Sequence, residues 1–328
     1  MNPTGVMAAG APPSQEIPKL NVLQAGRGLA ASAVLLFHAN IIYARQLADE
    51  VVPFKVLSVG SAGVEYFFVL SGFIMTLVHR RDLGVPSRVS RYAMARLVRI
   101  FPAFWVVFSL FLAAEFVLGL KEESLTGPGS YLWAYALLPF DGSSPLTAAW
   151  TLSHELLFYL VFGLAILNRA FGFAVICVWT TTCAAATVGR LTGLVDLSYP
   201  ASFLLADYNI LFAFGILSAL AFRSLRLDAA KGVLAAGVLV FAIAAWLVVA
   251  HGVPDLAVVF GVSAALVITA LVRFETAGSI TVPRWLVQLG DASYSVYLIH
   301  GPAMVVVAMV LRKIGLGAGL GPFGTVSV

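Results

Sequence analysis

Hydrophobic residues along this chain form long runs that short polar stretches interrupt. Nine runs approach the length of about 20 apolar residues that a helix needs to cross a bilayer. They cover residues 22–43, 58–79, 100–119, 150–168, 171–189, 201–222, 232–250, 255–272 and 293–311. The pattern predicts an all-α fold, a polytopic transmembrane bundle of about nine to ten helices.

The segments around these runs divide the chain into three parts. Residues 1–20 are rich in Ala, Gly and Pro and lack the basic-then-apolar layout of a signal peptide, so a disordered cytoplasmic tail is expected. Residues 21–313 form the membrane domain, and residues 314–328 form a C-terminal tail too rich in glycine to span. The connection 120–149 sets Gly and Pro among aromatic residues and is expected to hold a short interfacial helix.

Composition excludes an ordinary soluble protein. Hydrophobic residues make up 60% of the chain and charged residues 11%, against about 25% charged residues in a typical soluble domain. The net charge of +4 could indicate nucleic acid or anionic lipid as a partner. Because the arginines lie in short loops between apolar runs, they are interpreted as topology signals. The expected partner is the lipid bilayer and not nucleic acid.

The distribution of Lys and Arg predicts the orientation. One side of the membrane receives thirteen of these residues, six of them between the second and third helices, and the other side receives four or six. Cytoplasmic loops carry the excess of Lys and Arg, so the N-terminus is expected in the cytoplasm. The six are Arg80, Arg81, Arg88, Arg91, Arg96 and Arg99.

The first helix carries two ionisable residues, Arg27 and His38. Eleven residues make three helical turns plus about 20°, so both side chains lie on one face, about 16 Å apart along the axis. This face offers a fixed cation and a group that acts as a base near neutral pH. In the alternative interpretation, Arg27 extends to the interface and His38 bonds a neighbouring carbonyl.

In the fourth helix, Glu155 follows Thr151 and precedes Tyr159 by one turn each. It is either a partner of the helix N-terminus or a catalytic carboxylate, while a structural role is favoured for His154. Near the C-terminus, Ser293, Tyr297 and His300 share a face, and His300 precedes Pro302, where it could bond backbone freed by a kink.

Other polar residues have simpler explanations. Glu65, His79 and His251 lie near helix ends, where interfacial solvation suffices. Cys177 and Cys183 are expected to be small buried residues without a disulfide or metal. No phosphate-binding loop, nucleophile elbow or His-Glu-x-x-His motif occurs, and no metal is indicated.

Several stretches together resemble the acyltransferase-3 family of bacterial membrane acyltransferases, particularly its exopolysaccharide O-acetyltransferase branch. They are an Arg-x10-His element ending at His38, the segment Gly63 to Phe73, Arg96-x-x-Arg99-x-x-Pro102, Trp150-Thr151-Leu152-x-x-Glu155-x-x-Phe158-Tyr159, and Ser293 to His300. Each stretch is weak alone, but their order across residues 21–302 is fairly specific.

The resemblance implies an integral membrane O-acyltransferase of the bacterial inner membrane, with about ten helices. The donor would be acetyl-CoA or another acyl-CoA reached from the cytoplasm, and the acceptor a sugar hydroxyl of an envelope or exported polysaccharide, free or lipid-linked. The implied catalytic residues are His38, Arg27 and Glu155, with Arg96 and Arg99 binding the donor. The alternative function is a transporter or flippase of a glycan or lipid, in which the same polar face lines a path.

Overall fold

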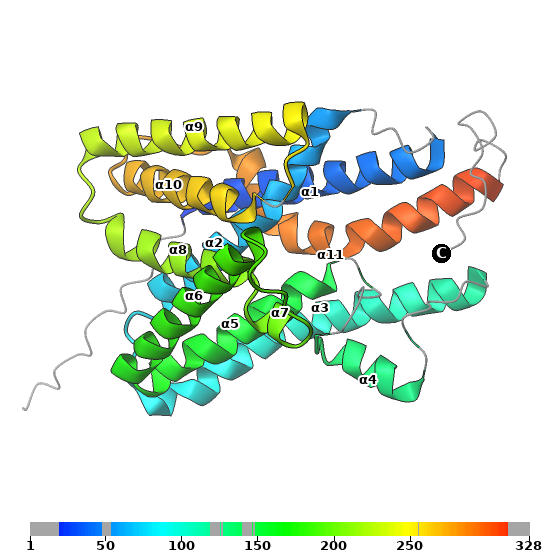
Figure 1. Ribbon diagram of the computed structural model, residues 1–328, viewed down its shortest axis with the longest axis horizontal. Helices are drawn as coiled ribbons and strands as arrows, with labels where there is room; N and C mark the ends of the chain where they lie inside the picture. Colours follow the sequence, from blue (N-terminus) through cyan, green and yellow to red (C-terminus); the bar gives the residue numbers. More distant parts are fainter. Residues whose placement is uncertain are drawn as a thin grey trace, which may run out of the picture.

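The computed structural model describes residues 20–47, 54–118, 125, 127–139, 146, 148–254 and 256–313. Within these residues the chain forms helices and their connections, without a strand (Figure 1). The helices are α1 (Asn21–Leu47), η1 (Lys55–Ser61), α2 (Ala62–Val78), η2 (Pro86–Arg88), α3 (Val89–Leu118), α4 (Pro128–Tyr135), α5 (Ala149–Leu167), α6 (Arg169–Leu191), α7 (Ala201–Leu204), α8 (Tyr208–Ala221), α9 (Leu227–His251), α10 (Ala257–Thr276) and α11 (Arg284–Lys313).

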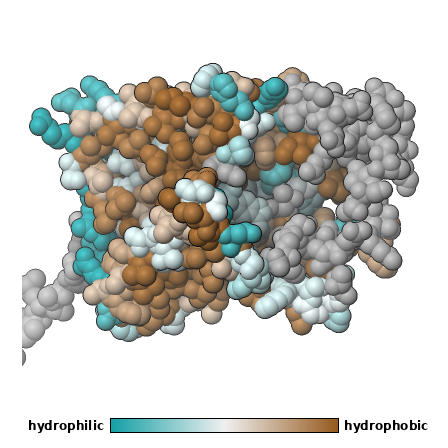
Figure 2. All heavy atoms as spheres, in the orientation of Figure 1, coloured by the Kyte–Doolittle hydropathy of each residue, from teal (hydrophilic) through white to brown (hydrophobic). Residues whose placement is uncertain are grey.

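Eight segments of the described chain are long and apolar enough to cross a membrane. Three of them join a short helix to a longer one: η1 to α2, η2 to α3 and α7 to α8. Helix α11 is a further long helix, whose 30 residues extend about 45 Å. The all-α, polytopic bundle predicted from the hydrophobic runs is confirmed. Hydrophilic residues gather at the left end of the molecule, and hydrophobic residues cover its middle (Figure 2).

Helices α1 and α11 lie side by side and run in the same direction (Figure 1). Gly28 of α1 meets the backbone of Gly290, and further along both helices His38 meets His300. Helix α2 runs opposite to α1, because Gly63 packs on Ala30 while Tyr66, further along α2, reaches back to Gly26. These directions agree with the alternate crossings predicted for the first, second and ninth hydrophobic runs.

Aromatic side chains fill the centre of the bundle. Phe158 of α5 stacks on Phe212 of α8 with ring centroids 4.1 Å apart, and Phe68 of α2 packs edge-on against Phe212 at 5.1 Å. All three are at most 3% exposed. This cluster fixes α2, α5 and α8 against one another and forms one wall of the site described below.

The expected start of the third span was wrong. Helix α3 begins at Val89 instead of residue 100, so Arg91, Arg96 and Arg99 belong to a helix and not to a loop. Arginine has a high helix propensity, and its long stem can lie along apolar surface while the charged end reaches a polar region. The consequence for function is direct, because Arg96 and Arg99 are three residues apart and therefore share a helix face.

The run 201–222 is divided between α7 and α8. Asn209 causes much of the break, because its amide donates to the carbonyls of Phe203 and Leu204, while Asp207 accepts from the first amide of α8.

The connection 120–149 contains a short helix, α4, as predicted. Residues 1–19 and 314–328, the expected tails, lie outside the described residues.

Three predictions of exposure were also wrong. Glu65 is 6% exposed and His79 8% exposed, so neither depends on interfacial solvation. His79 hydrogen-bonds Asp82 at 2.9 Å within the same tight turn, and this local partner explains its burial. Cys177 is exposed on the outer face of α6, whereas Cys183 is buried as expected.

Candidate active site

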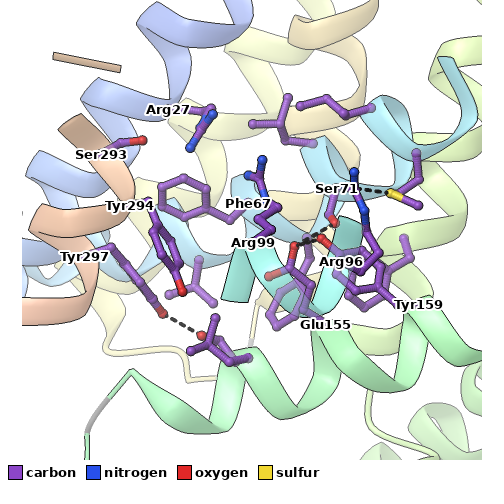
Figure 3. Close-up of a pocket in the computed structure, with 18 residues that line it drawn as sticks. Arg27, Phe67, Ser71, Arg96, Arg99, Glu155, Tyr159, Ser293, Tyr294 and Tyr297 are labelled. Atoms are coloured by element: carbon purple, nitrogen blue, oxygen red, sulfur yellow. Dashed lines mark hydrogen bonds between the residues drawn. The ribbon is translucent and has the colours of Figure 1, made fainter. Parts of the chain in front are cut away.

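Helices α1, α2, α3, α5, α8 and α11 enclose a cavity with a volume of about 90 Å³ (Figure 3). This space holds several water molecules or a narrow segment of a larger ligand. Its lining comprises Arg27, Val64, Phe67, Phe68, Leu70, Ser71, Ile74, Met75, Arg96, Arg99, Thr151, Leu152, Glu155, Tyr159, Phe212, Ser293, Tyr294 and Tyr297. The apolar residues come largely from α2, and the charged ones from α1, α3 and α5.

Three arginines converge on the cavity from two helices. Arg27 projects from α1, whereas Arg96 and Arg99 project from successive turns of α3 (Figure 3). Among the described residues, none of the three forms an ion pair within 4.0 Å. With Glu155 as the one carboxylate of the lining, three positive charges and one negative charge leave a formal excess of +2. The cavity is therefore suited to an anion.

Neutral groups hold the arginines in place. The Arg27 Nη1 donates to Gln24 Oε1 at 3.1 Å, one turn earlier on α1. The Arg96 guanidinium lies over the Tyr159 ring, 5.6 Å from its centroid, and its Nη1 contacts Met75 Sδ at 3.5 Å. These contacts leave most donor positions of both side chains without a carboxylate partner.

Glu155 is held by hydroxyl groups from two helices. Its Oε1 accepts from Ser71 Oγ of α2 at 3.2 Å and from the hydroxyl of Tyr159, one turn along α5. On the same face of α5, Thr151 Oγ1 and the Tyr297 hydroxyl are 2.9 Å apart (Figure 3). The polar face predicted for Glu155 with Thr151 and Tyr159 is present, and it faces the cavity, not the helix N-terminus.

His38 does not line this cavity. It lies further along α1, where its Nδ1 is 2.9 Å from the carbonyl oxygen of Val34 and 3.2 Å from Nε2 of His300. The bond to Val34 is the carbonyl contact predicted by the alternative interpretation of His38. It involves Nδ1, so the Nε2 atom of His38 takes no part in it. Arg27 and His38 both face α11, as their spacing predicts.

Two other histidines have structural partners. His154 is buried, and its Nδ1 is 2.9 Å from Asn209 Oδ1, in line with the structural role favoured for it. His300 Nδ1 lies 2.5 Å from the carbonyl oxygen of Tyr297. The prediction that His300 bonds the backbone freed by Pro302 is therefore wrong. Pro302 has no N–H to donate to the carbonyl of Leu298, four residues earlier, and His300 bonds the carbonyl of Tyr297 instead.

Some features of the site were missed from the sequence. Ser71 lies in the stretch Gly63 to Phe73, where spacing predicted no chemical role for it, yet its hydroxyl bonds the cavity carboxylate. The contact between His38 and His300 joins residues that are 262 positions apart. Only the shared face of Ser293, Tyr297 and His300 hinted at it. Among the described residues, no group of three or more His, Cys, Asp or Glu side chains could hold a metal ion.

Comparison with known proteins shows the family to which this chain belongs. Residues 20–328 match the profile of the acyltransferase-3 family, described as an acyltransferase domain. The exopolysaccharide production protein ExoZ of Rhizobium meliloti is 30% identical over 277 residues, covering 80% of this chain and 82% of the relative. The acyltransferase MdmB of Streptomyces mycarofaciens is 28% identical over 303 residues, covering 82% and 75%.

The putative membrane-bound transacylase BcsY of Komagataeibacter xylinus is 29% identical over 304 residues, covering 85% of this chain and 72% of the relative. No solved structure matches the chain. These relatives favour an enzyme over the transporter or flippase considered from the sequence. The chain belongs to the acyltransferase-3 family and is a membrane acyltransferase.

Proposed function

We propose that the protein transfers an acetyl group from cytoplasmic acetyl-CoA to a sugar hydroxyl of an envelope or exported polysaccharide. The observation that carries this proposal is the arrangement of two groups along α1. Arg27 of this helix lines the cavity with two further arginines, and His38 lies further along the same helix. The acceptor class rests on the similarity to ExoZ, whose name ties that protein to exopolysaccharide production.

The charge of the cavity supports a donor that carries phosphate groups. Guanidinium groups bind phosphate oxygens through paired hydrogen bonds, and such charge-assisted bonds are stronger than neutral ones. Arg96 and Arg99 are the eighth and eleventh of the 30 residues of α3, close to the exposed Arg88 and Arg91. From the excess of Lys and Arg in the loops on this side, we infer that it faces the cytoplasm across a bacterial inner membrane, where acyl-CoA is found.

The separation of Arg27 from His38 assigns them different tasks. A group that stabilises a developing oxyanion must lie about 3 Å from that oxygen, whereas eleven helical residues separate these side chains by about 16 Å. Arg27 therefore binds the donor, and it does not stabilise the oxyanion at His38. The pantetheine arm of CoA would pass between them, through the cavity and toward His38.

His38 supplies the base in the simpler of two mechanisms. Its Nε2 removes the proton of the sugar hydroxyl as that oxygen attacks the thioester carbonyl; the new C–O bond forms, the C–S bond breaks, and the departing thiolate takes up the proton. In the second mechanism Nε2 first accepts the acyl group and then passes it to the sugar. Glu155 faces Arg27 and Arg99 across the cavity and balances their charge between donor binding events.

Arg99→Gln tests the donor site, with Arg91→Gln as the matched control. Arg91 is an exposed arginine of the same helix that does not line the cavity. Loss of a charge-assisted bond costs roughly 1.5–3 kcal/mol, so we expect Arg99→Gln to raise the KM for acetyl-CoA about 10- to 100-fold. The control should keep the wild-type KM. Equal KM values for both variants would contradict the proposed donor site.

A further inference from the structure

We propose that His300 is a positioning residue for His38: it fixes the ring and its tautomer, so that Nε2 of His38 is the reacting atom. The proposal rests on the proposed function and deepens it. It starts from the contact between α1 and α11, where the two imidazole rings lie 4.8 Å apart at an angle of 51°. His300 is 3% exposed, so the contact is sheltered.

The hydrogen-bond partners determine which nitrogen carries each proton. A carbonyl oxygen only accepts, so His38 Nδ1, 2.9 Å from the Val34 oxygen, carries a hydrogen. For the same reason His300 Nδ1, 2.5 Å from the Tyr297 oxygen, carries one. A neutral His300 then has its lone pair on Nε2. This nitrogen lies 3.2 Å from His38 Nδ1, whose one hydrogen it shares with the Val34 oxygen.

The opposite tautomers do not fit these surroundings. With hydrogen on Nε2 of both rings, each Nδ1 lone pair would face a carbonyl oxygen. Burying such repulsive contacts is costly, because neither carbonyl oxygen would then receive a hydrogen from the ring beside it. The arrangement therefore leaves the Nε2 of His38 unprotonated and free to accept a proton or an acyl group.

His300 also acts when His38 changes charge. When Nε2 takes the hydroxyl proton, the ring becomes an imidazolium whose positive charge extends to Nδ1. The lone pair of His300 accepts from that Nδ1–H and stabilises the cation, much as a buried carboxylate does in a catalytic triad. After the thiolate leaves, the proton moves from Nε2 to sulfur and the neutral pair is restored.

Helix α11 connects this pair to the cavity. Tyr297 accepts from His300 through its carbonyl, while its hydroxyl, 2.9 Å from Thr151, lines the cavity. One turn of α11 therefore holds both the donor site and the histidine that orients the base. His300 touches neither the donor cavity nor the reacting atoms, so it acts only through His38.

Paired substitutions at His300 test the proposal. His300→Gln retains an acceptor near the position of Nε2, whereas His300→Leu removes it at similar size. Misplacement of a catalytic group by about 1 Å can cost about 100-fold. We expect kcat to fall about 100-fold in His300→Leu with an unchanged KM for acetyl-CoA, and to recover at least about tenfold in His300→Gln. Wild-type kcat in His300→Leu, or equal losses in both variants, would overturn the proposal.

A second measurement does not depend on activity. The chain has five histidines, so selective ¹⁵N labelling gives few signals, and His38→Gln identifies those of His38. Neutral His38 should show its hydrogen on Nδ1 in the wild type. In His300→Leu the Val34 oxygen is the one acceptor left to Nδ1–H, so a larger fraction of His38 should carry its hydrogen on Nε2. Hydrogen on Nε2 in the wild type would refute the positioning role even in an active enzyme. The Nδ1–H tautomer in a protein without acetyl transfer would refute the proposed function alone.

Discussion

Arg27 shows how much one side chain depends on its geometry. Its guanidinium bonds Gln24 through Nη1 and presents its remaining N–H groups to the cavity. A lysine at this position would keep the charge but lose the planar fork that binds two phosphate oxygens at once. The two substitutions Arg27→Lys and Arg27→Gln thus separate charge from shape.

We expect Arg27→Lys to raise the KM for acetyl-CoA about tenfold and Arg27→Gln to raise it further, because the loss of one bond to a charged group is worth about 1.5–3 kcal/mol. The kcat value should change little in both variants, since Arg27 lies far from His38. Steady-state kinetics in detergent micelles provide the measurement. A fall in kcat with constant KM would instead place Arg27 at the reacting carbonyl.

At the scale of helices, the contact between α1 and α11 depends on glycine. A Cβ atom on Gly290 would lie 1.9 Å from the backbone oxygen of Gln24, which cannot move independently of α1. We expect Gly290→Ala to lower stability by about 1–3 kcal/mol, the usual cost of overpacking, and to reduce kcat by displacing His300 from His38.

Gly232 is the matched control for Gly290. It lies inside α9, and a Cβ atom there has no neighbour within 4 Å. Since glycine weakens a helix interior by roughly 0.5–1 kcal/mol relative to alanine, Gly232→Ala should leave stability unchanged or slightly raise it. Thermal unfolding in detergent compares the two variants. Equal melting temperatures would show that α1 and α11 do not pack as closely as described.

The turn after α2 predicts a pH dependence of stability. His79 follows the span Lys55–Val78 directly, and burial lowers the pKa of its imidazole, although its bond to Asp82 acts in the opposite direction. The unfolded chain then binds more protons than the folded chain below the ordinary His value of about 6.5. The contribution of His79 is fully present above that pH and is lost as the pH falls through the folded-state pKa.

His79→Gln should therefore flatten the decrease in melting temperature between about pH 6.5 and 5. His251→Gln, at an exposed histidine that ends α9, should keep the wild-type decrease. The same slope in His79→Gln and the wild type would show that His79 is not the group responsible.

Hydrophobic runs predicted the spans well because the bilayer requires each crossing helix to be apolar and about 20 residues long. They could not place the start of α3, since its first turns carry Arg91, Arg96 and Arg99 and look like a loop in hydropathy. The break before Asn209 depends on side-chain bonds to Phe203 and Leu204, which periodicity does not reveal.

The candidate site was predictable in its parts but not in its assembly. Spacing placed Arg27 and His38 on one face, and Glu155 with Thr151 and Tyr159 on another. Which helices meet depends on packing between distant segments, such as Gly28 against Gly290. For that reason neither the separation of His38 from the arginine cavity nor its contact with His300 could be derived from spacing alone.

For the whole molecule, the orientation in the membrane is the prediction on which donor access depends. In a background without Cys177 and Cys183, a cysteine at Gly129 of α4 should react with an impermeant maleimide added outside the cell. A cysteine at Ser87 should react only after the membrane is opened. Both positions are exposed in the structure. The reverse pattern would place the arginine-rich end outside and contradict a cytoplasmic donor.

The central claim is that His38 carries acetyl transfer to an exported polysaccharide. The most direct measurement is the O-acetyl content of that polysaccharide in cells that lack the gene and receive wild type, His38→Ala or His251→Ala. Wild type and His251→Ala should restore acetylation, whereas His38→Ala should not, although all three proteins reach the membrane in equal amounts. Restored acetylation with His38→Ala, or unchanged acetyl content with wild type, would contradict the account.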